Sequence, residues 1–272
     1  MTSERFLQKL LEILRSKNYP DYVQQSPEDI ASDVQKYARV VIEGEMVDEV
    51  VNVGQSKVGG SPDMPEGMSW PHESGREESP LAFLCQINLA EVQEHDLAGK
   101  LPKTGMLWFF SIAEGDLAYG YEIDDGTTKV VYQANPAELS SRDIPDALAA
   151  EEDSEIQERR LLFGPAILLE EVDEGVLEQK RYDCSIEDSI TDAVRSLGGR
   201  SGTVRMLGNP HYFREENQVD SGNENETVLL EVDGYSVASL AFGEGTFIWT
   251  IHPEKLSEGK LEKTTLVFEP GS

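Results

Sequence analysis

The stretch from Ser56 to Phe110 constrains the fold of this chain most strongly. It begins with a loop rich in glycine and proline, SKVGGSPDMPEGMSWP, and continues into two apolar runs that a polar connection separates. Glycine and proline fix turns through their backbone geometry, and short apolar runs between turn signals are typical of buried strands. We therefore expect a rigid loop, a strand at 81–87 and a second strand at 106–110.

The remaining elements follow from periodicity. Helical spacing of apolar residues predicts an amphipathic helix over 3–16. Ser26 as N-cap and Pro27 at the first helical position predict a second helix that ends near Ala38. A short helical turn is expected after Asn88, and SIED at 185–188 resembles a capping box that opens another helix. Apolar and β-branched runs predict further strands at 38–43, 129–132, 161–169, 227–233 and 246–251.

One pattern occurs twice along the chain. An apolar strand, a polar excursion, a glycine and an aromatic strand follow one another in 81–110 and again in 227–251. An internal duplication and a chance alternation of strands and turns both account for it. The expected fold class is α+β, with two similar, mostly antiparallel β-rich halves at about 40–135 and 161–272 and with flanking helices. An N-terminal helical segment (1–39) precedes them, and an acidic connector (about 136–160) joins them.

The charge balance narrows the classes of partner. The chain has 272 residues with 52 acidic and 23 basic side chains, a net charge of -29. Such a surface repels phosphate backbones and anionic membranes, so we expect neither nucleic acid nor a membrane as partner. Solubility, salt adaptation and attraction of a basic protein or a cationic ligand each account for the acidity. Charged residues interrupt the apolar N-terminus, so no signal peptide is expected, and Cys85 and Cys184 are expected to be reduced thiols in the cytoplasm.

Several pieces of the sequence together resemble a known family. They are SKVGGSPDMPEGMSWP, PLAFLCQINLAEV, LPKTGMLWFF, MLGNPHYF, VLLEVDGYSV and FGEGTFIWTIHPEKL, in order from about Val40 to the end. These pieces resemble the bacterial YwqG-like proteins, a domain of unknown function. The resemblance implies an α+β fold with two similar β-rich halves and brings no established activity. The chain departs from the family pattern at Glu244, where relatives tend to have Asp, and at Glu231, where they tend to have Gln.

The Gly/Pro loop supplies the candidates for ligand or partner binding: Lys57, Gly59, Gly60 and Trp70. A phosphate-binding P-loop needs its lysine after the glycines, followed by Ser or Thr and a helix. Here Lys57 precedes the glycines and two prolines follow, so the loop is not a P-loop. A rigid structural loop is the simpler interpretation. Trp70 is either a core aromatic or a stacking surface for a ligand.

Candidates for catalysis are few. Glu231 and Glu244 both lie at strand ends beside turns, and acid–base catalysis would require burial to raise the pKa of one of them. Solvated turn residues are the simpler interpretation. Cys85 lies in an apolar run and is expected to be a small buried residue. The four histidines, His72, His95, His211 and His252, have no spacing typical of metal ligands, so neither a metal nor a cofactor is expected.

Three functions remain open. The first is a non-catalytic binding or protein-interaction module, of an immunity or regulatory type, which the acidic surface suits. The second is a hydrolase-like enzyme that uses carboxylates in a pocket bounded by the 56–71 loop. A sensor that binds a small molecule without turnover is the third.

Overall fold

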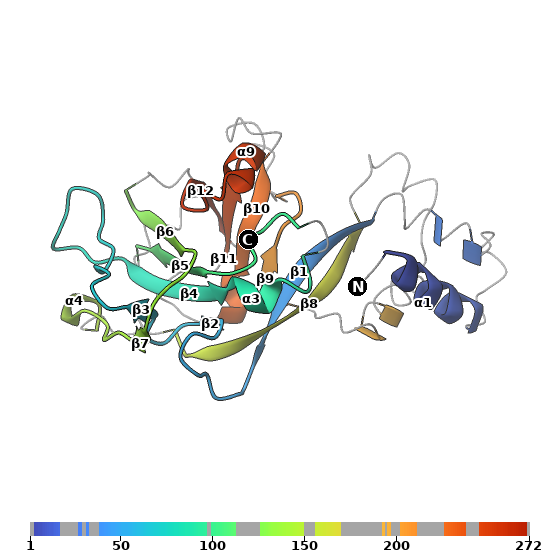
Figure 1. Cartoon of the computed structure of the whole chain (residues 1–272), viewed down its shortest axis with the longest axis horizontal. Coiled ribbons are helices and arrows are strands. Elements are labelled where there is room, and N and C mark those ends of the chain that lie inside the picture. The colour runs from blue at the N-terminus through green and yellow to red at the C-terminus, as the bar shows by residue number, and fades with distance from the viewer. Residues whose placement is uncertain are drawn as a thin grey trace.

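One large antiparallel sheet organises the computed structural model of this chain (Figure 1). The structure describes residues 3–16, 27–28, 31–32, 38–96, 99–112, 126–149, 156–169, 192–193, 195–196, 202–210, 226–237 and 245–270. The ten strands lie side by side in the order β12-β11-β10-β9-β1-β8-β2-β4-β5-β6, and β3 and β7 form a separate pair. Their bounds are β1 Ala38–Val47, β2 Lys57–Val58, β3 Asp63–Pro65, β4 Ala82–Asn88, β5 Met106–Ser111, β6 Thr128–Gln133, β7 Leu139–Ser141, β8 Arg159–Leu169, β9 Val204–Met206, β10 Thr227–Asp233, β11 Gly245–Ile251 and β12 Thr264–Pro270.

The expected α+β class is wrong, because the described residues are mostly β. Apart from α1 (Ser3–Ser16), the helices whose bounds are described have four or five residues each: α3 Leu89–Val92, α4 Asp146–Ala149, α8 Gly234–Val237 and α9 Pro253–Ser257. Helices this short cannot form a layer of their own. The sheet instead covers its own inner face by curling into a nearly closed, barrel-like form.

The expected pair of β-rich halves is also replaced by one continuous sheet. β1, from the first part of the chain, pairs with β8 over ten residues and with β9 over three. β8 in turn pairs with β2. A three-stranded meander lies at each end of the sheet, β4–β6 at one and β10–β12 at the other. The long β1–β8 pair therefore joins the early and late strands into one hydrogen-bonded unit.

The main core lies on the inner face of the curled sheet. In Figure 1 the strands β4–β6 run across the direction of β10–β12, and aromatic side chains from the two ends meet between them. The rings of Phe109 on β5 and Trp249 on β11 lie 5.1 Å apart. The indole of Trp249 donates a hydrogen bond of 3.1 Å to the hydroxyl of Thr128 on β6. Burial of such large rings supplies much of the stabilisation of a fold like this.

A second apolar cluster lies on the outer face of β4 and β5. Phe83, Trp108 and Phe110 are buried there together with Met64 of β3. The small β3–β7 pair and the loop around Trp70 cover these side chains. The Gly/Pro loop of the sequence is therefore a cover for the outer face of the sheet.

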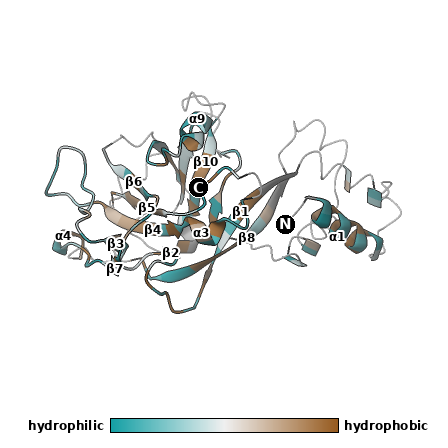
Figure 2. Cartoon of the chain, in the orientation of Figure 1, coloured by the Kyte–Doolittle hydropathy of each residue, from teal (hydrophilic) through white to brown (hydrophobic). Residues whose placement is uncertain are grey.

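Most predicted elements are confirmed. The helix over 3–16 is α1, whose apolar and polar residues alternate in bands in Figure 2. The predicted strands correspond to β1, β4, β5, β6, β8, β10 and β11, and Asn88 caps α3 as expected. The short strands β2, β3, β7 and β9, and the C-terminal β12, were not predicted. Most of the predicted helix after Ser26 and the capping box at 185–188 lie outside the described residues. None of the described helices is long and apolar enough to cross a membrane.

Candidate functional site

A row of polar side chains crosses the outer face of the sheet beside the Gly/Pro loop. Arg160 on β8 lies opposite Lys57 on β2, and Lys57 lies opposite Gln86 on β4. Residues directly opposite in an antiparallel pair project from the same face. All three are almost fully buried, although each carries a charge or an amide. Burial of such groups is costly unless each is paired.

Lys57 is neutralised by two carboxylates. Its ammonium lies 3.6 Å from Oδ1 of Asp63 and 2.8 Å from Oε2 of Glu158. The side chains of Lys57 and Asp63 are 3% and 2% exposed, whereas that of Glu158 is 42% exposed. Only the Lys57–Asp63 pair is therefore shielded from water, and screening weakens the contact with Glu158.

Gln86 locks Asp63 in place from the other side. The backbone N–H of Asp63 donates to Oε1 of Gln86 at 2.8 Å, and Nε2 of Gln86 donates to Oδ2 of Asp63 at 2.6 Å. The same carboxylate oxygen accepts the N–H of Gly54 at 2.9 Å, and the carbonyl of Asp63 accepts the indole N–H of Trp108. Nε2 of Gln86 also donates to the carbonyl of Gln55 at 2.8 Å, so one amide side chain of the sheet holds the loop at Gln55 and at Asp63.

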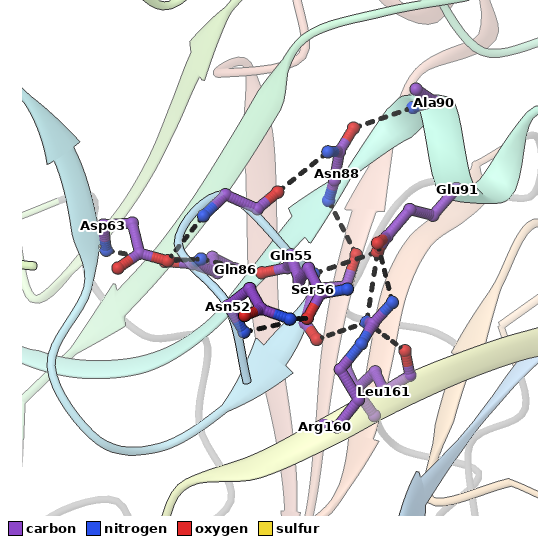
Figure 3. A network of polar contacts seen from close by, with 11 residues as sticks. Asn52, Gln55, Ser56, Asp63, Gln86, Asn88, Ala90, Glu91, Arg160 and Leu161 are labelled. Atoms are coloured by element: carbon purple, nitrogen blue, oxygen red, sulfur yellow. Dashed lines mark hydrogen bonds and ion pairs between the residues drawn. The ribbon is translucent and has the colours of Figure 1, made fainter. Parts of the chain in front are cut away.

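A second group of contacts fixes the start of the loop, as Figure 3 shows. Arg160 forms an ion pair of 2.6 Å with Glu91 of α3 and donates to the carbonyl of Ser56 at 2.7 Å. Glu91 accepts the N–H of Ser56, and the hydroxyl of Ser56 accepts the N–H of Asn88. Because the groups in both networks satisfy one another, the contacts of Lys57, Asp63 and Gln86 and those of Arg160, Glu91 and Ser56 together form a rigid frame for the loop.

Gly59 and Gly60 pass close to the segment that precedes β8. Both have positive φ, 67° and 65°, and the N–H of Gly60 donates to the carbonyl of Ile156 at 2.9 Å. A Cβ at Gly59 would lie 2.4 Å from the carbonyl oxygen of Ile156, and one at Gly60 would lie 2.7 Å from Oε2 of Glu158. The two glycines are therefore required by chain packing at these positions.

A small, mostly apolar pocket lies beside this frame. Gly60, Trp70, Ala82, Phe83, Ile144, Leu148 and Ile156 line it. The indole N–H of Trp70 donates a hydrogen bond of 2.8 Å to the carbonyl of Leu81. The Trp70 ring packs edge-on against Phe110, with ring centroids 5.6 Å apart. Two of the residues singled out from the sequence, Gly60 and Trp70, thus line one preformed pocket. Lys57 and Gly59 are not among the lining residues. Lys57 belongs to the row of buried polar side chains, and Gly59 packs against Ile156.

Glu231 lies in a different row, on the part of the sheet near β9. It is opposite Arg205, which in turn is opposite Glu43 on β1, and the guanidinium of Arg205 forms an ion pair with Glu231. Glu43 accepts the N–H of Gly202 at 3.1 Å. Burial raises the pKa of Glu43, while the Gly202 amide and Arg205 oppose this shift and Glu231 adds to it. Glu231 does not line the pocket at Trp70, and its proposed partner Glu244 lies outside the described residues.

The other reactive side chains do not gather into a site within the part of the chain that the structure describes. Cys85 is fully buried in β4, and burial raises the pKa of its thiol, which makes it a poor nucleophile. Among the described residues, His, Cys, Asp and Glu form no group of three or more that could hold a metal ion. His211 lies outside these residues.

Several members of these clusters carry no signal in the sequence. No recognisable motif contains Asp63, Glu91, Glu158 or Arg160, and Arg205 and Glu43 lie far apart in the chain. Gln86 did carry a signal, since it is an amide inside an otherwise apolar strand. A buried amide needs partners for its polar atoms, and this requirement could have identified it.

A comparison with known protein families matches most of this sheet. Residues 56–269 match the family described as "Domain of unknown function (DUF1963)". The chain belongs to this family. The DUF1963 match runs from β2 into β12, whose last residue, Pro270, lies beyond it. The match includes both polar rows except Glu43, whereas the central strand β1 precedes it. No curated protein matches the chain.

Replacement of Gly59 by Ala tests the close approach of the loop to Ile156. The new Cβ would meet two backbone carbonyls at a φ that L residues avoid, so we expect a loss of about 3 kcal/mol or more in the free energy of unfolding. Gly67→Ala is the matched control, because φ is 81° there and nothing lies within 4 Å of the added atom. It should lose only about 1–2 kcal/mol. Urea denaturation of both variants checks this, and equal losses would contradict the account.

A double-mutant cycle tests the Lys57–Asp63 ion pair. Lys57→Met and Asp63→Asn each leave the partner charge buried, so each should cost about 3–5 kcal/mol of unfolding free energy. The double variant should cost less than the sum of the two, with a coupling of about 0.5–3 kcal/mol. The exposed Lys129 serves as control, since Lys129→Met should change stability by less than about 0.5 kcal/mol. Additive losses would show that the two charges do not interact.

The raised pKa of Glu43 predicts a pH-dependent effect of Glu43→Gln. Because the pKa is higher in the folded state, the stability that Glu43 contributes is present at low pH and is lost as pH rises through the folded pKa. The neutral variant should therefore gain stability relative to the parent between about pH 4 and 7. Glu258→Gln gives the opposite sign, because its hydrogen bond with Lys260 lowers the pKa of Glu258. Thermal melts across this range check both variants, and parallel profiles would refute the prediction for Glu43.

Proposed function

We propose that this chain is a YwqG-like, non-catalytic protein-interaction module that binds a basic partner. The observation that supports it most directly is an apolar loop tip held on a rigid base. Val50 and Val53, in the connection between β1 and β2, are 86% and 57% exposed. Exposed apolar groups close together are typical of contact surfaces in proteins. The cytoplasmic location is part of the same proposal and stays a prediction from the sequence.

The loop that carries these valines is held at several points. Gln55 donates its N–H to the carbonyl of Asn52, and the side chain of Gln55 accepts the N–H of Asn52 at 2.8 Å. Gly54 is bound to Asp63 and Asn88 on its two sides. A rigid loop loses little conformational entropy when it binds, which favours affinity. The buried frame would then serve to present the valines.

The charge of the chain supports a basic partner. Asp48 and Glu49 are exposed directly before Val50, and the net charge of the chain is -29. Acidic residues around an apolar contact accelerate association with a basic protein and add specificity. The same charge disfavours a nucleic-acid partner, and this stays a prediction from the sequence.

A hydrolase-like activity is the second candidate, and the row of Glu43, Arg205 and Glu231 favours it. Arg205 pairs with Glu231, while burial raises the pKa of Glu43. Two carboxyl groups in such different environments suit a general acid and a general base. Turnover of an ester, phosphoester or glycoside that Glu43→Gln and Glu231→Gln both abolish would support this function over the first.

The double variant Val50→Ser/Val53→Ser tests the interaction function. Affinity capture from the native cytosol should retain a stoichiometric basic protein with the parent chain and release it at high salt. The variant should retain at least tenfold less, because it loses the apolar contact while its charge is unchanged. Val50→Ile/Val53→Ile is the matched control and should bind as the parent does. An empty eluate from the parent, or equal capture by the serine variant, would refute the proposal.

A further inference from the structure

The buried lysine and aspartate of the frame are neighbours at a distance longer than a hydrogen bond. Nζ of Lys57 lies 3.6 Å from Oδ1 of Asp63. The two side chains are 3% and 2% exposed, so bulk water does not separate them. Cγ of Asp63 is bonded to Oδ1 and is therefore an immediate neighbour of the lysine nitrogen. An amine held beside a carboxyl carbon is the arrangement that formation of an amide requires.

The other carboxylate oxygen of Asp63 accepts two hydrogen bonds. The N–H of Gly54 donates to Oδ2 at 2.9 Å, and Nε2 of Gln86 donates to the same oxygen at 2.6 Å. When an amine attacks Cγ, negative charge develops on the oxygen that stays on this carbon. Two fixed donors at that oxygen stabilise the transition state, as the donors of an oxyanion hole do. The geometry therefore favours an attack in which Oδ1 is the leaving oxygen.

A second carboxylate lies on the other side of the lysine nitrogen. Oε2 of Glu158 accepts a hydrogen bond of 2.8 Å from Nζ of Lys57. A base at this distance is within reach of the proton that must leave before the amine becomes a nucleophile. The side chain of Glu158 is 42% exposed, so it also connects the buried pair with solvent.

We propose that Lys57 and Asp63 condense to an intramolecular amide (isopeptide) bond, with Glu158 as the proton relay. The bond between Nζ and Cγ forms, and the bond between Cγ and Oδ1 breaks. Of the three protons on the ammonium group, one stays on the nitrogen and two leave with Oδ1 as water, one of them by way of Glu158. Oδ2 becomes the carbonyl oxygen of the amide and keeps both of its donors. The positive and the negative charge disappear together, so the reaction needs no further reactant.

Burial supplies the driving force for this step. In water, hydration of the two ions favours hydrolysis of an amide. The protein interior removes that hydration, and the amide removes both buried charges. Groups that the fold holds side by side also react far faster than free groups in solution. The ion pair in the structure is the state before the reaction, and the amide keeps β2 joined to β3. This bond goes beyond the proposed interaction function and does not depend on it.

Mass spectrometry of the full chain tests the bond. After incubation of the folded protein, its intact mass should lie one water below the mass of its sequence. Trypsin cleaves after lysine and arginine, so an unmodified chain gives the peptides 40–57 and 58–76. An acylated Lys57 resists cleavage, so the cross-linked chain should give one peptide, 40–76, that lacks one water. A cyclic imide at an aspartate also loses water but leaves Lys57 cleavable, which distinguishes the two products.

Three variants assign the roles of the residues. The readout is the cross-linked fraction of the peptide at a series of times after expression, and circular dichroism checks that each variant is folded. Lys57→Met should give no loss of water, because the nucleophile is absent. Glu158→Gln keeps both reacting groups and should cross-link at least about a hundredfold more slowly, because the proton relay is absent. Glu254→Gln removes the same charge from an exposed site on α9 and should match the parent.

A parent chain that keeps the full mass of its sequence and is cleaved at Lys57 would overturn the proposal. Loss of water together with cleavage at Lys57 would do the same, because the modification would then lie elsewhere. Cross-linking of Glu158→Gln at the rate of the parent would overturn the role given to Glu158. No protein partner takes part in these measurements. A negative result here therefore leaves the partner-binding proposal standing, and a failure of the valine-loop test leaves the bond standing.

Discussion

The buried ion pair between Lys57 and Asp63 is the interaction on which the loop and its surroundings depend. Neither charge could stay in the protein interior alone, because each would lose its hydration without compensation. Together with Gln86, which binds both the backbone and the side chain of Asp63, they join β2, β3 and β4. The cover over the outer aromatic cluster is attached at this point. A shifted loop would separate the two charges. The pair therefore favours a single geometry of the loop.

The same frame positions two features of the surface, the exposed valines and the Trp70 pocket. The N–H of Gly54 donates to the carboxylate of Asp63. The ion pair therefore also positions the loop that carries the exposed Val50 and Val53. On the other side, Glu158 binds Lys57 and packs against Gly60, which lines the Trp70 pocket. The exposed valines and the Trp70 pocket thus share one support without sharing residues. A binding module gains from such a division, because each contact can change while the support stays the same.

The sequence predicted the features whose signal lies within a few neighbouring residues, and it missed those that depend on residues far apart in the chain. Strands such as β4 and β5 carry their apolar pattern locally, and the N-cap of α3 is a local signal as well. The end of β1 was missed because Gly44 interrupts the pattern. In the structure that glycine admits Phe163, whose Cε1 would lie 2.8 Å from a Cβ there. The α+β expectation failed because the curl of the sheet depends on contacts such as Phe109 with Trp249, which are 140 residues apart. Partners such as Arg205 for Glu231 are likewise fixed by strand order, which no local pattern reveals.

Native-state hydrogen exchange of two loop amides tests the central claim most directly. The N–H groups of Gly54 and Asp63 donate only to side chains of the buried frame, so their protection reports on that frame. If the frame holds the loop as described, both amides exchange with opening free energies close to those of β4. Rates as fast as those of an exposed loop would contradict the account, because the valines and the pocket edge would then lack a fixed support.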